Sequence, residues 1–186
     1  MLVFATVAPP SLVALPLGAL LLAARPRTRT EWLAVALASG AGAVPLAAPG
    51  RGLFDLLSRV WIVLVTVAFA AGAKLQPPRF WPVALRACLY AAAGVTLLVA
   101  ARGVGGGGGD GWREVQWEAT RGASRAMRYV VEVAPSLYPA FEPAVRLFAA
   151  WPVWLVLETL AGLALAWRAH AVIARTPLSR VAVLNP

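Results

Sequence analysis

The chain has 186 residues, of which 60% are hydrophobic and only 13% charged, and its mean hydropathy is +0.73. Soluble domains carry about 25% charged residues, so this balance is typical of a protein embedded in a bilayer. A net charge of +9 would suit nucleic acid in a soluble protein. Here the arginines stand mostly at the ends of apolar segments, where they set topology and meet anionic headgroups. We therefore expect the lipid bilayer as a partner and no nucleic acid.

The apolar segments predict an all-α fold, a polytopic transmembrane helical bundle within a single membrane domain, residues 1–186. About 20 apolar residues at 1.5 Å rise each cross a hydrocarbon core of roughly 30 Å. On this basis we expect about five spans and one amphipathic interfacial helix. The spans are predicted at 2–24, 32–48, 53–73, 80–101 and 145–174.

The first two spans carry helix-breaking and helix-packing signals. Prolines in the first span, among them Pro16, predict kinks whose freed backbone groups neighbouring helices satisfy. The second span has small residues four positions apart, Ala36 with Gly40 and Ala38 with Gly42. Such pairs let helix backbones approach closely, so we expect this span to pack tightly against another helix.

The third and fourth spans each carry charges close to an end. Asp55 and Arg59 stand four residues apart, a spacing that predicts an ion pair on one face of a helix. Arg86 lies a turn and a half inside the fourth span. Its long side chain either extends back to the headgroups or pairs with Glu158 of the last span, and both interpretations stay open.

A glycine-rich tether, residues 103–111, separates the fourth span from the amphipathic helix predicted at 112–134. Along this helix small and apolar side chains fall on one side and charged ones on the other, with Arg121, Arg125 and Arg128 on the charged side. We expect either a helix that lies in the membrane interface or a surface helix that packs on the bundle.

Glu158 is the residue most suggestive of function. It lies near the middle of the apolar run 148–167, where a charge costs roughly 2.5 to 3.5 kcal/mol on insertion scales. Three interpretations are open: a protonated acid that bonds a neighbouring helix, an ion pair with Arg86, and a group that binds a ligand or shuttles protons. Arg168 and His170 end the same span and are expected to face the headgroups.

Few residues could carry catalytic or metal chemistry. Cys88 and His170 are the sole cysteine and histidine, which excludes an internal disulfide and leaves no cluster of metal ligands. The glycine run lacks the Lys-Ser or Lys-Thr of a phosphate loop, and no nucleophile motif is present. We expect a protein that is not an enzyme and holds no metal or cofactor.

Orientation follows from the lysines and arginines of the short loops. With five spans and the N-terminus outside, eight of them lie inside and two, Arg51 and Arg59, lie outside. The positive-inside rule favours this arrangement, which leaves the C-terminus in the cytoplasm. The long loop before the last span carries further arginines, so an inverted orientation stays open.

The C-terminal part of the chain resembles a known family. The run LAGLALAWRAHAVIARTPL, residues 160–178, follows the arginine-rich helix 112–134 and includes the His170 turn and the Pro177-Leu178 step. In this order of features it resembles the YybS-like family of bacterial integral membrane proteins. That resemblance implies a bacterial cell membrane and a distant similarity to the substrate-binding S components of energy-coupling-factor transporters.

Two functions are compatible with these features. The first is a transport-related component that binds a small solute within the bundle, with Glu158 and Arg86 at the site. The second is a non-catalytic accessory subunit whose small-residue helices pack against partner subunits in a larger membrane complex. The acid within the span and the family resemblance favour the first, and the small-residue faces favour the second.

Overall fold

The structure is a computed structural model that describes residues 8–47, 49, 52–75, 79–103 and 110–174. Every regular element among these residues is a helix, which confirms the predicted all-α class. The elements are α2 (Ala8–Ala23), α3 (Arg29–Ala47), α4 (Leu53–Leu75), α5 (Phe80–Gly103), α6 (Asp110–Val133), the 3-10 helix η1 (Pro135–Ala140), α7 (Phe141–Ala149) and α8 (Trp151–Ile173). The start of the first predicted span, most of the glycine-rich tether and the Pro177-Leu178 step lie outside the described residues.

Three of the described helices are long and apolar enough to cross a membrane: α4, α5 and α8. The apolar part of α2 covers only Pro10–Ala23, and α3 is rich in alanine, glycine and polar residues. Length and composition therefore identify three candidate spans, fewer than the five predicted from the sequence. The fold is consistent with a membrane protein.

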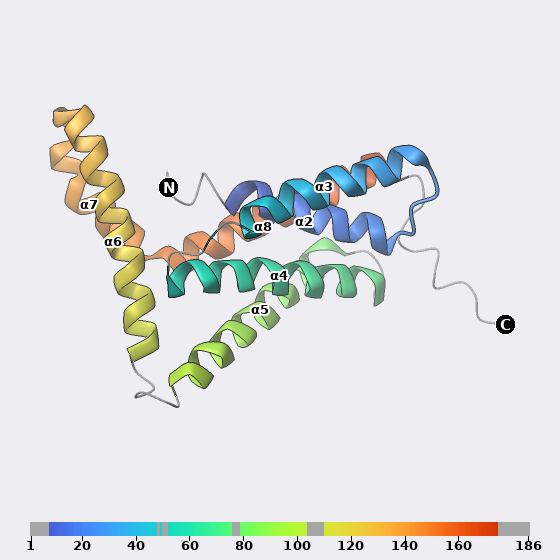
Figure 1. Cartoon of the computed structure of the whole chain (residues 1–186), viewed down its shortest axis with the longest axis horizontal. Helices are drawn as coiled ribbons and strands as arrows, with labels where there is room; N and C mark the ends of the chain where they lie inside the picture. Colours follow the sequence, from blue (N-terminus) through green and yellow to red (C-terminus); the bar gives the residue numbers. More distant parts are fainter. Residues whose placement is uncertain (1–7, 48, 50–51, 76–78, 104–109, 175–186) are drawn as a thin grey trace.

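The long helices form two antiparallel hairpins, α2 with α3 and α4 with α5 (Figure 1). The hairpins are joined because α2 packs against both α4 and α8. Figure 1 shows α6 lying crosswise to α4 and α8, at the end of the bundle where both of them begin. We call residues 110–149 the α6–α7 arm, because α7 folds back beside α6.

The core lies between α2, α4, α5 and α8. Phe69 is fully buried on α4 and makes edge contacts with Trp167 of α8 at 5.8 Å and with Phe80 of α5 at 6.2 Å between ring centroids. Leu20 and Leu163 are also fully buried. Lipid is as apolar as these side chains, so within a bilayer such contacts stabilise the bundle mainly through close packing.

The start of α3 is fixed by its own sequence. Thr28 Oγ1 accepts a hydrogen bond from the Glu31 backbone N–H at 3.2 Å, and Glu31 Oε2 accepts one from the Thr28 N–H at 3.0 Å. This reciprocal pair is a capping box, which satisfies backbone donors that a helix start leaves open. The Thr-x-x-Glu spacing therefore explains why the helix begins at Arg29.

Only one of the two small-residue pairs on α3 packs against a helix. Gly42 lies against Leu15 of α2, and Ala38 is 8% exposed, as the spacing predicts for a helix contact. Ala36 is exposed instead, and a Cβ added at Gly40 would meet no atom within 4 Å. The Ala36–Gly40 face of α3 therefore points away from the bundle.

The last predicted span begins later than the sequence indicates. The chain leaves helical geometry at Ala150, and α8 begins at Trp151 with a proline at its start. Proline is favoured there because the first helical N–H groups have no partner within the helix. Glu158 thus lies about 10 Å from the start of a helix about 35 Å long, in the half of α8 that begins at the α6–α7 arm.

Candidate binding cavity

A cavity of about 310 Å³ lies between α4, α5 and α8, at the end of the bundle that α6 crosses. Apolar and aromatic side chains from four helices line it. They are Phe54, Leu57, Ser58 and Trp61 of α4, Ala92, Val95 and Thr96 of α5, Trp112 of α6, and Trp151, Pro152, Leu155 and Val156 of α8. This size lies at the lower end of the range for small-molecule sites.

Most polar groups around the cavity are already bonded within the protein. Trp61 Nε1 donates a hydrogen bond to Thr159 Oγ1 at 3.0 Å, and Ser58 Oγ donates one to the Phe54 carbonyl at 2.8 Å. Within the described part of the chain, the Trp112 indole and the Thr96 hydroxyl make no hydrogen bond. No lining side chain carries a charge. The lining therefore suits an uncharged and mostly apolar molecule.

The carboxylate of Glu118 attaches α6 to the first turn of α4. Glu118 Oε2 accepts a hydrogen bond from the Phe54 N–H at 2.8 Å, although the two residues are 64 positions apart. Gly52 precedes α4 with a φ of +153°, and a Cβ there would lie 2.5 Å from Glu118 Oε1. Glycine is thus required at position 52 both for the backbone conformation and for the space that Glu118 occupies.

A second attachment joins α6 to α8 at the same place. Trp151 Nε1 donates a hydrogen bond to Gln116 Oε1 at 3.0 Å, and the Trp151 ring meets Phe54 edge-on at 5.2 Å. Hydropathy and charge patterns indicate neither attachment, because both join residues far apart in the chain. The one local signal is that Gly52 provides no side chain to cap α4.

The two residues expected at an intramembrane site are placed apart from the cavity. Glu158 is half-buried on α8, and its Oε2 is enclosed with no hydrogen-bond partner among the described residues. Arg86 is exposed on α5.

Two ion pairs occur within the described ranges, Asp55–Arg59 at 2.8 Å and Glu142–Arg146 at 2.6 Å. The first confirms the pair predicted on the third span, and neither includes Glu158 or Arg86.

The arginines predicted on the charged side of the amphipathic helix are exposed on α6. They are Arg121, Arg125 and Arg128. The Arg121 guanidinium lies 4.7 Å from the centre of the Trp117 ring, a cation–π contact on the outer side of the arm. Val115, on the opposite side of the helix, is fully buried. The apolar side of α6 is therefore used, at least near its start, for packing on protein.

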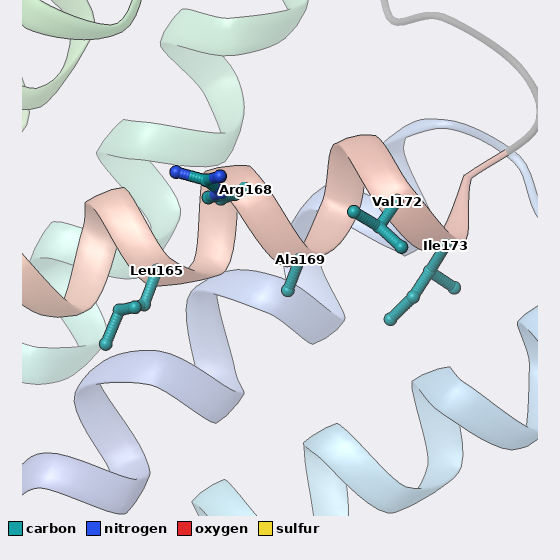
Figure 2. A pocket seen from close by; sticks show the side chains of 5 residues that line it. All are labelled: Leu165, Arg168, Ala169, Val172 and Ile173. Carbon is teal, nitrogen blue, oxygen red and sulfur yellow. The ribbon is translucent and has the colours of Figure 1, made fainter.

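At the far end of α8, Arg168 is exposed and His170 is buried. The His170 side chain is 5% exposed, and its Nε2 has no hydrogen-bond partner among the described residues. This differs from the expected position at the headgroups, because His170 lies on the face of α8 that includes buried Leu163 and Ala166. Five residues of α8 line a hollow, and Figure 2 shows the five side chains, with Arg168 on the opposite side of the helix from Leu165. Only α8 residues line this hollow, so it is a feature of the surface.

No group of three or more histidine, cysteine, aspartate or glutamate side chains that could hold a metal occurs among the described residues. Cys88 is a buried free thiol on α5.

No protein-family model matches the chain, and neither the curated proteins nor the solved structures contain a significant match. The resemblance of residues 112–178 to the YybS-like family therefore stays a prediction.

Proposed function

We propose that this protein is a multi-pass membrane protein that binds a small, uncharged and mostly apolar solute as a transport-related component. The observation that carries the proposal is the cavity lined by Trp61, Trp112 and Trp151 among three helices of membrane-spanning length. Aromatic and aliphatic walls with a few polar groups are typical of small-molecule sites. We assign the cavity as the solute site, and we keep Glu158 as a second group that such a solute or a proton could use.

We propose that α2 and α3 also cross the membrane, which gives five spans. In support, the α2–α3 hairpin lies along the same direction as α4 and α8 and packs against both through α2 (Figure 1). The short loops and helix ends opposite the α6–α7 arm carry basic residues, among them Arg25, Arg27, Lys74, Arg79 and Arg168, and the arm carries arginines of its own. When the short loops alone are counted, the positive-inside rule favours a cytoplasmic position for this end and an outside position for the arm.

A membrane of bacterial origin is the setting implied by the YybS-like resemblance, and we include it in the proposal. The order of features supports it, because an arginine-bearing helix, α6, precedes the span that contains the LAGLALAW run of residues 160–167. Genes for a paired ATPase and a coupling subunit beside the gene for this protein would agree with a transport role. A neighbourhood without either would count against it.

Saturable energy transfer from tryptophan to a neutral apolar probe tests the solute site. The protein in lipid nanodiscs is titrated with N-phenyl-1-naphthylamine, and empty nanodiscs provide the correction for partitioning into lipid. Ala92→Phe adds a ring to the lining, whereas Ala93→Phe adds the same ring one residue away, outside the lining. We expect Ala92→Phe to weaken probe binding about tenfold or more and Ala93→Phe to leave it unchanged. Equal binding by the two variants would reject the site.

An accessory subunit is the second candidate, and the outer face of α3 favours it. Leu33 and Leu37 are 61% and 66% exposed there, and Gly40 leaves room for a helix backbone to approach. Purification in mild detergent distinguishes the two functions. A stable protein partner and no bound solute would favour the accessory subunit. A monomer that retains a small molecule would favour the solute-binding component.

A further inference from the structure

The α6–α7 arm is attached to the bundle around the rim of the cavity. Three contacts at the start of α6 join it to three different helices. On α5, Val99 lies so close to Gly111 that an added Cβ would be 3.0 Å away. On α8, Trp151 donates to Gln116, and on α4 the Phe54 N–H donates to Glu118. Trp112 lies among these contacts and, of the described side chains of α6, is the one that lines the cavity.

Of these contacts, the one made by Glu118 is the strongest candidate for control of the arm. A carboxylate that accepts a hydrogen bond from the first turn of a helix also interacts favourably with the positive end of the helix dipole. Gly52 has no side chain that could cap the start of α4. The Phe54 N–H in the first turn of α4 therefore finds its acceptor on α6, at Glu118. Two of the attachments also share residues with the cavity. Phe54 bonds to Glu118 and Trp151 bonds to Gln116, and both Phe54 and Trp151 line the cavity.

We infer that Glu118 is a positioning residue that holds α6 over the cavity, and that release of its contact with α4 opens the cavity beside Trp112. A solute then enters and leaves at the end of the bundle that α6 crosses. The arm, which carries the exposed arginines of α6, acts as the cover of the site. The inference rests on the proposed function only in treating the cavity as a solute site.

Thiol labelling reports the opening of the cavity without any ligand. In a Cys88→Ala background, a cysteine is placed at Val95, which lines the cavity and is 8% exposed, or at Leu97, which is 70% exposed on the outer face of α5. The rate of reaction with N-ethylmaleimide is measured for the full chain in lipid nanodiscs. The Val95 position reports access to the cavity, and the Leu97 position reports general loosening of the helix.

We expect Glu118→Ala to raise the labelling rate at position 95 about tenfold, the effect of losing one helix-capping hydrogen bond, with no change at position 97. Glu118→Gln keeps an acceptor oxygen without the charge, so its effect should be smaller and in the same direction. Glu114→Ala is the matched control, since Glu114 is exposed one turn earlier on α6. It should change neither rate.

Gly52→Ala tests the same contact from the α4 side. The added methyl group would overlap the Glu118 carboxylate, so this variant should also raise labelling at position 95 alone. Gly122→Ala, at a position of α6 with no atom within 4 Å of the new Cβ, should have no effect. Unchanged labelling at position 95 in Glu118→Ala, or an equal rise at positions 95 and 97, would overturn the inference. Failure of the probe titration alone would reject the solute site and leave this result standing.

Discussion

Trp61 Nε1 donates a 3.0 Å hydrogen bond to Thr159 Oγ1, and this bond joins α4 to α8 inside the bundle. Thr159 is fully buried and Trp61 is 6% exposed. The Thr159 hydroxyl donates in turn to the Leu155 carbonyl at 2.6 Å, so its oxygen is oriented to accept from the indole. Because Trp61 also lines the cavity, the bond fixes one wall of the proposed site.

Thr159→Val should destabilise the protein, because it leaves the Trp61 N–H without a partner in the interior. We expect a loss of about 1 kcal/mol in the free energy of unfolding, the usual cost of such a bond between membrane helices. Thr66→Val is the matched control, since the buried Thr66 hydroxyl has no hydrogen-bond partner among the described residues. Unfolding in detergent mixtures of increasing dodecyl sulfate content measures both. An equal cost at the two positions would argue against the bond.

Gly162→Ala should weaken the contact between α8 and α2. A Cβ at position 162 would lie 2.9 Å from the Leu12 carbonyl oxygen, which is backbone and cannot turn aside. Overpacking of this kind costs roughly 1 to 3 kcal/mol. Gly40→Ala on the outer face of α3 meets no atom within 4 Å, so it should be neutral or slightly stabilising. The same unfolding titration compares the two, and a neutral Gly162→Ala would contradict the packing described for α8.

Glu158→Gln and Arg86→Gln should have independent effects on stability. The two side chains form no ion pair in the described part of the chain, and Arg86 is exposed. The unfolding free energies of the single variants should therefore add in the double variant within about 0.5 kcal/mol. A coupling energy above about 1 kcal/mol would instead support an ion pair between Glu158 and Arg86, one of the interpretations that the sequence leaves open. Loss of a co-purified small molecule in Glu158→Gln would support the ligand role of this acid.

Cysteines at positions 79 and 138 should label from opposite sides of the membrane. Arg79 is exposed at the start of α5, and Tyr138 is 71% exposed on the α6–α7 arm. In a Cys88→Ala background, a membrane-impermeant maleimide should reach position 138 in intact cells and position 79 only after the cells are opened. The reverse pattern would mean an inverted orientation. Labelling of both positions from one side would contradict the proposed crossing of α5, the one proposed span between them.

Local features of this fold could be predicted from the sequence, and contacts between distant segments could not. Hydropathy locates α4, α5 and α8, the last with a predicted start at residue 145 instead of 151, and the four-residue spacing of Asp55 and Arg59 identifies their ion pair. The pairs Ala36–Gly40 and Ala38–Gly42 look alike in sequence, yet one faces out and the other packs on α2. The rotation of α3 about its axis decides between them, and that rotation depends on its neighbours.

The candidate site is the part of the structure least predictable from the sequence, for the same reason. Glu158 attracts attention because a charge in an apolar run is visible in the sequence, whereas the cavity arises from the meeting of four helices. Glu118 looks like one more charged residue on an amphipathic helix until its contact with Phe54, 64 positions earlier, is known. The break at Ala150 has no signal in the sequence, because residues 148–167 form one continuous apolar run.

The packing of α2 against α8 has a consequence for the order in which this protein is assembled. Leu12 is 1% exposed and lies against Gly162, which the ribosome adds 150 residues later. The side of α2 that α8 covers therefore stays without this partner while the intervening helices are synthesised. The packing of α2 is therefore completed only when α8 has been synthesised, and a chain truncated before α8 would leave that side of α2 open.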